Sequence, residues 1–67
     1  MRIAEDGSEI RWALAMKHRG ETQGIYYWGP EKSLENCKES ARYLHKNNRS
    51  CKFELTDFVS ESIIQLH

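Results

Sequence analysis

The stretch that decides the fold is Ser33-Leu-Glu-Asn-Cys-Lys-Glu-Ser-Ala-Arg-Tyr-Leu-His-Lys-Asn-Asn48. Its apolar side chains recur at steps of three, four and three, which places them on one face of an α-helix: Leu34, Cys37, Ala41 and Leu44. Ser33 is a suitable N-cap, because its hydroxyl can accept from the N–H groups of the first turn. The closing asparagines tolerate the left-handed conformation that ends a helix. The sequence therefore predicts one amphipathic helix over residues 33–48.

Strand patterns precede this helix. Residues 9–18 alternate between larger apolar side chains and polar or small ones, the period of a half-buried strand. A helix is the rival interpretation, because Ala, Leu and Met favour helices, but the alternation and the Gly-containing stretch that follows favour a strand. Residues 25–28 form an aromatic and β-branched strand, which Gly29-Pro30 ends. Residues 19–24, between the two strands, are predicted to form a hairpin loop.

After the helix, residues 51–55 alternate again and predict a third strand. Residues 57–67 are ambiguous between a short helix and a short strand. Residues 2–4 could form a short edge strand before the Asp6-Gly7 turn signal, or a frayed tail. The prediction is a single small α+β domain over residues 1–67, with a two-layer ββαβ order. Its antiparallel sheet presents one face to the helix. This face of the sheet bears Leu14, Met16, Phe53 and Leu55.

Length and composition limit the possible functions. A chain of 67 residues buries a small core and cannot easily enclose a deep substrate pocket, so we expect no enzymatic activity and no cofactor. Ten basic and ten acidic side chains cancel, whereas nucleic-acid binders are usually basic. No apolar run approaches the roughly 18 residues of a membrane span. Since the N-terminus also lacks an apolar signal sequence, we expect no membrane contact and a cytoplasmic location.

The two cysteines are expected to be free thiols. A helix rising about 1.5 Å per residue carries the chain far from Cys37 before Cys51 is reached, and a disulfide requires Cα atoms within about 7 Å. The candidate metal ligands also lack the short spacings that bring two ligands together in a metal site. These candidates are Cys37, Cys51, His18, His45 and His67. No histidine is placed beside Cys37 to activate it, and no nucleophile elbow or phosphate-binding glycine loop is present.

A row of basic side chains follows the predicted helix at steps of four, three and four, with one further lysine beside it: Lys38, Arg42, His45, Arg49 and Lys46. Such a row can follow phosphates and release counterions, which makes nucleic-acid binding one hypothesis. The alternative is a solvated helix face whose cations pair with Glu35 and Glu39 at i,i+3 spacing.

Aromatic residues give the second surface hypothesis. Because one helix buries only one sheet face, we expect some of Trp12, Tyr26 and Trp28 to lie on the open face or its rim. Exposed Tyr and Trp residues often anchor protein interfaces, and they can also stack on bases. The alternative is that the N-terminal tail or residues 57–67 cover them.

Trp12, the run Tyr26-Tyr-Trp-Gly29 and the capped helix containing Ala41 together resemble the sheet-plus-helix DNA-binding domains at the N-termini of phage integrases. Those domains place three strands before the helix, whereas this sequence predicts two before it and one after, and no residue role carries over. The preferred hypothesis is a non-enzymatic module that binds another protein or a second copy of itself. The alternative is a nucleic-acid-binding domain.

Overall fold

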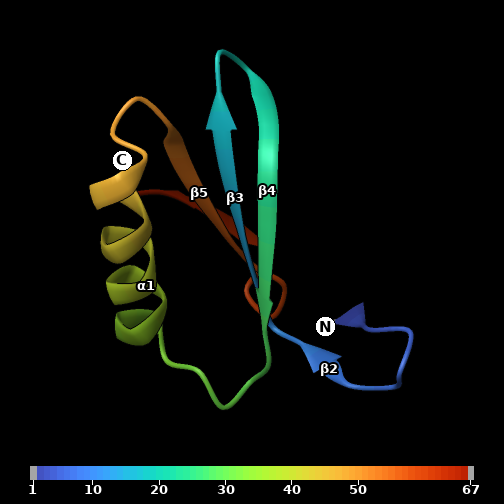
Figure 1. Ribbon diagram of the computed structural model, residues 1–67. Coiled ribbons are helices and arrows are strands. Elements are labelled where there is room, and N and C mark those ends of the chain that lie inside the picture. Colours follow the sequence, from blue (N-terminus) through green and yellow to red (C-terminus); the bar gives the residue numbers. More distant parts are fainter. Residues whose placement is uncertain (1, 67) are drawn as a thin grey trace.

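The computed structural model describes residues 2–66 and has the predicted α+β arrangement (Figure 1). The helix lies against one side of a four-stranded antiparallel sheet, whose strand order is β4-β3-β5-β6. A separate two-stranded sheet, β1-β2, precedes it. The elements in chain order are β1 (Arg2–Ile3), β2 (Glu9–Ile10), β3 (Trp12–His18), β4 (Glu21–Trp28), α1 (Leu34–Asn47), β5 (Lys52–Asp57) and β6 (Ser62–Gln65).

The predicted helix is confirmed within one residue at each end. Ser33 is its N-cap, and the Ser33 hydroxyl accepts from the Asn36 N–H at 3.2 Å. At the other end, the Asn48 side chain donates to the Leu44 carbonyl at 2.9 Å. The asparagine thus closes the helix by satisfying a carbonyl that has no partner within the last turn.

The ambiguous C-terminal segment forms a strand. Ser62–Gln65 pairs antiparallel with β5, and Leu55 lies opposite Ile64. This adds a fourth strand to the predicted sheet, so the order around the helix is ββαββ. Residue 67 lies outside the described residues.

The predicted loop over residues 19–24 is wrong, because the strand already begins at Glu21. Only Arg19 and Gly20 connect β3 to β4, and their φ angles are 53° and 82°. Two successive positive φ values are characteristic of a type I′ turn, whose twist matches that of the flanking strands. Arginine seldom adopts a positive φ, which is why the sequence did not indicate so tight a turn.

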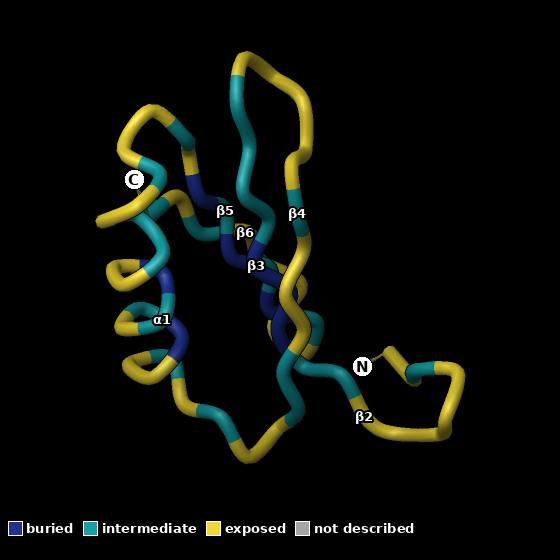
Figure 2. Tube along the Cα trace, viewed as in Figure 1, coloured by how far each residue is buried: buried dark blue, intermediate teal, exposed yellow. Residues whose placement is uncertain are grey.

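The predicted strand over residues 9–18 is interrupted at Arg11. The Arg11 N–H donates to the Trp28 carbonyl, while its own carbonyl accepts from the Phe58 N–H, at 2.9 and 2.8 Å. The chain before it leaves the main sheet, and β2 pairs with β1 instead. The predicted short strand at residues 2–4 therefore exists, but in a small hairpin that projects from the main body (Figures 1 and 2).

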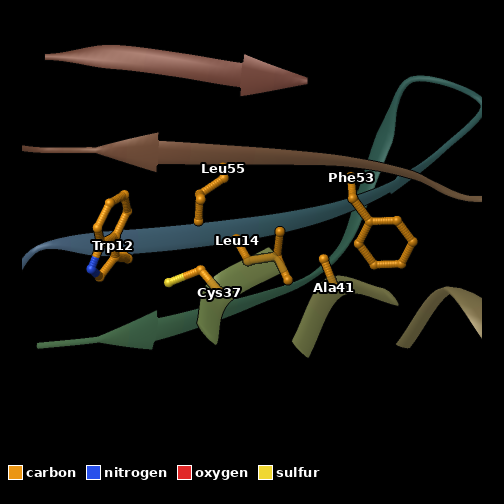
Figure 3. Close-up of a cluster of buried hydrophobic side chains, with 6 residues drawn as sticks. All are labelled: Trp12, Leu14, Cys37, Ala41, Phe53 and Leu55. Atoms are coloured by element: carbon orange, nitrogen blue, oxygen red, sulfur yellow. The ribbon is translucent and has the colours of Figure 1, made fainter. Parts of the chain in front are cut away.

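The core lies between α1 and the central strands (Figure 3). The helix contributes Cys37 and Ala41, both fully buried. The strands contribute the remaining members of the cluster: Trp12, Leu14, Phe53 and Leu55. The predicted helix-facing side of the sheet is thereby confirmed, with Met16 packed at its margin.

Candidate binding surfaces

The three aromatic candidates do not lie on the open sheet face. Trp12 is buried beneath the helix with 2% of its surface exposed, and its indole N–H donates to the Lys32 carbonyl at 2.9 Å. Because Trp12 shares the strand phase of Leu14, the alternation that turns Leu14 toward the helix does the same for Trp12. The expectation that it could be exposed is therefore wrong.

Tyr26 and Trp28 lie opposite Leu14 and Trp12 in the neighbouring strand, so they share the helix-facing side. Trp28 is half-buried against the core, with the Lys32 ammonium 5.6 Å from its ring centroid. Tyr26 stays exposed at the rim, as the sequence hypothesis required of at least one of the three. It belongs to an edge strand, which nothing covers on its outer side in the described chain.

The open face instead presents the residues between these aromatics. Ile25 and Tyr27 are 47% and 52% exposed, and Tyr27 lies opposite the small side chain of Ala13. We use the name β4 surface for Ile25, Tyr26 and Tyr27 together with the outer edge of their strand. The sequence analysis missed Ile25 and Tyr27. Leu14 faces the helix and lies opposite Tyr26, so the neighbours Ile25 and Tyr27 must face the open side of the sheet.

The backbone of β4 is available along this edge. The Trp28 carbonyl points toward β3, where it accepts from Arg11. Since backbone groups alternate in direction along an antiparallel strand, Tyr26 also points inward, while Ile25 and Tyr27 present their N–H and C=O groups outward. A long edge with apolar side chains and unpaired backbone groups is a template for strand pairing.

In the structure, the side chains of the predicted basic row do not form one continuous surface. Arg49 lies beyond the end of the helix, and the His45 ring contacts Phe53 edge-on, with centroids 5.9 Å apart. Lys46 is exposed in the last turn of the helix. Lys38 and Arg42 remain one turn apart on the side that faces β6.

These two cations border a hollow of about 320 Å³ between α1 and β6. We call it the β6 groove, and it is lined by Lys38, Arg42, Ile64, Gln65 and Leu66. No sequence motif indicated this groove, because residues 57–67 had no assigned structure from which helix and strand could be placed together.

A second hollow, of about 360 Å³, lies at the far end of the sheet near the β3–β4 turn. Three cations border it, namely Lys17, Arg19 and Lys52, together with Glu54. The Lys17 ammonium is 2.9 Å from the Glu54 carboxylate, which also accepts from the Gln65 amide. These two contacts, with the Gln65 hydrogen bond the larger, lower the pKa of Glu54.

The two cysteine thiols, Cys37 and Cys51, form no disulfide. Both thiols are free, as predicted, and burial raises the pKa of Cys37, so this thiol stays protonated and weakly nucleophilic at neutral pH. Among residues 2–66, no three His, Cys, Asp or Glu side chains gather closely enough to hold a metal ion.

Comparison with known proteins finds no matching family model, curated protein or solved structure. The helix in the described range, α1, lacks the length and apolar character that crossing a membrane requires.

Proposed function

We propose that this protein is a non-enzymatic interaction module that pairs the edge of β4 with a strand of another protein molecule. The observation that carries the proposal is the outer edge of β4, which pairs with no other strand among residues 2–66 and along which Ile25, Tyr26 and Tyr27 are exposed. Strand addition supplies affinity through backbone hydrogen bonds and specificity through alternate side chains. Exposed tyrosines supply contact area at low cost in conformational entropy.

A second copy of the chain is the partner that fits this edge best. Residues 22–28 carry no charge, and the chain has a formal net charge of zero, so two copies do not repel one another. In an antiparallel pair centred on Tyr26, Ile25 of one copy lies opposite Tyr27 of the other. Such aromatic and β-branched cross-strand pairs stabilise sheets.

The same register places Gly24 opposite Trp28 of the second copy. Glycine leaves room above the sheet, and an aromatic ring from the neighbouring strand can cover that gap. Pairing would thus join two four-stranded sheets into one continuous sheet, with one helix per copy on the same face.

Sedimentation equilibrium over a range of concentrations tests this proposal. We expect reversible dimers of the native protein and monomers of the double variant Ile25→Lys, Tyr27→Lys, in which lysines face one another across the dimer axis. The matched control, Ile63→Lys with Gln65→Lys, adds the same charges to the opposite edge of the same sheet and should still dimerise. A native protein that stays monomeric at every concentration would contradict pairing with itself.

Nucleic-acid binding remains the alternative prediction. Lys38 and Arg42 support it, but the predicted row does not continue through His45, which packs on Phe53, or through Arg49, which lies past the helix. A titration with single-stranded and duplex oligonucleotides at low salt tests it, because phosphate contacts give binding that weakens steeply as salt is added.

A further inference from the structure

The β6 groove combines a free strand edge, apolar walls and uncompensated positive charge. These three observations concern a different edge of the sheet from the β4 surface, and they do not depend on the proposed function above.

The strand edge comes first. The Leu66 N–H donates to the Phe53 carbonyl at 2.9 Å, so the backbone of Leu66 points inward toward β5. By the alternation of an antiparallel ladder, Ile63 and Gln65 point their N–H and C=O groups outward. In the described part of the chain, β6 is the last strand of the sheet and no element covers that side.

The apolar walls come second. Ile64 and Leu66 are half-buried and pack against the core, so their side chains extend from the sheet toward α1. The hollow of about 320 Å³ above them falls in the range of about 300–1,000 Å³ typical of ligand sites. A strand added beside β6 would turn every second side chain into this space.

The charge comes third. Lys38 and Arg42 form no ion pair with any residue in the range 2–66, and none of the lining residues is acidic. Arg11 and Lys17, by contrast, each pair with a carboxylate. The groove therefore favours a ligand that supplies negative charge beside its apolar groups.

We propose that the β6 groove binds an extended acidic peptide, which pairs with the outer edge of β6. Its apolar side chains contact Ile64 and Leu66, and its carboxylates contact Lys38 and Arg42. A strand held between a sheet edge and a helix is an established mode of peptide recognition. A nucleic acid fits less well, because no aromatic side chain lines the groove to stack on bases.

Fluorescence anisotropy with a labelled peptide of alternating Glu and Val residues tests the proposal at low salt. We expect the native protein to bind this peptide and not the corresponding peptide of alternating Lys and Val. The double variant Lys38→Glu, Arg42→Glu should bind the acidic peptide at least about tenfold more weakly, since a complementary contact becomes a repulsive one. It should bind the basic peptide instead, which excludes misfolding as the cause.

Lys46→Glu is the control, because it reverses the charge of one cation on the same helix away from the groove. At about 0.15 M salt, where the Debye length is about 8 Å, the affinity of this control for the acidic peptide should stay within about twofold of native, because a charge outside the contact is largely screened. Two further peptides carry N-methyl groups on every second amide, one on the odd and one on the even positions. Only the peptide whose methylated amides would donate to β6 should lose binding. Equal weakening by Lys46→Glu would overturn the proposal, as would indifference to N-methylation, no peptide binding at low salt, or binding of oligonucleotides alone.

Discussion

Asp57 is the most buried charged side chain among the described residues, with 6% of its surface exposed. Its carboxylate accepts from Arg11 through Nε at 3.3 Å and Nη2 at 3.2 Å, and from the Val59 N–H at 3.0 Å. The guanidinium also lies over the Trp12 ring, 4.5 Å from its centroid. One carboxylate thereby fixes the end of β5, the turn that follows it, and the bend where the chain enters β3.

Replacing Asp57 should destabilise the fold. Asp57→Asn keeps the shape but loses the charge-assisted pair with Arg11, so we expect a loss of about 2 kcal/mol in the free energy of unfolding. Urea denaturation at neutral pH measures this change. Glu39→Gln, on an exposed helix position, serves as the control and should leave the unfolding midpoint nearly unchanged.

Because Asp57 is ionised in the folded protein, we expect the stability of the fold to depend on pH. The hydrogen bonds from Arg11 lower the pKa of Asp57 from 3.8 to about 2. A lowered pKa stabilises the folded state fully above pH 3.8, and this contribution is lost as the pH falls toward 2. Urea denaturation should therefore show that the free energy of unfolding of the native protein falls between pH 5 and pH 2. In Asp57→Asn this fall should be smaller. An identical decline in both proteins would rule out Asp57 as a source of acid sensitivity.

Cys37 provides a prediction about packing. It is fully buried, so Cys37→Ala should cost about 1 kcal/mol through the small cavity left behind. Cys37→Ser should cost more, because a buried hydroxyl needs a hydrogen-bond partner. Since both thiols are free, adding reductant should not change the melting temperature of the native protein. A reductant-dependent shift would indicate a disulfide.

At the scale of elements, the tight β3–β4 turn holds a residue that is unfavourable at its position. Arg19 has a φ of 53°, a region that Asn adopts far more readily. Arg19→Asn should therefore stabilise the protein by about 0.5–1 kcal/mol, measured by thermal unfolding. Arg19→Val should destabilise it, because a β-branched side chain is strained there.

The helix was predictable because periodicity, N-cap and closing residues all agree within one continuous segment. The β4 strand was predicted too short because, among Glu21–Gly24, only Thr22 favours a strand by itself, and the segment pairs with β3 across a register shift. Likewise, β6 could not be identified from its own residues, since its strand form depends on pairing with β5. Tertiary pairing overrides local preference most readily in such short segments.

At the scale of the molecule, amide hydrogen exchange should report the layout of the sheet. Residues such as Leu14 and Leu55 lie in strands flanked on both sides, so their amides should exchange most slowly. Along β4, Tyr26 and Trp28 should be protected, while Ile25 and Tyr27 should exchange fast in dilute protein. Uniform protection along β4 under those conditions would contradict the register described here.

The candidate surfaces were harder to predict than the fold. Of the three aromatic candidates, Tyr26 is exposed at the rim of the sheet, Trp28 is half-buried and Trp12 is buried. Trp12 is buried because it shares the strand phase of Leu14, which faces the helix. The β6 groove depends on two segments that are distant in sequence. No local pattern can indicate a hollow formed by their meeting.

The pairing of β3 with β5 has a consequence for how the chain folds. Trp12 pairs with Asp57 and Lys17 with Lys52, and about half the chain lies between the two strands. The β3–β4 and β5–β6 hairpins join neighbours in sequence, so we expect them to form early. Pairing of β3 with β5 must close a long loop, so we expect it to form late. Until that step, β3 has a second bare edge, so refolding yield should fall as protein concentration rises.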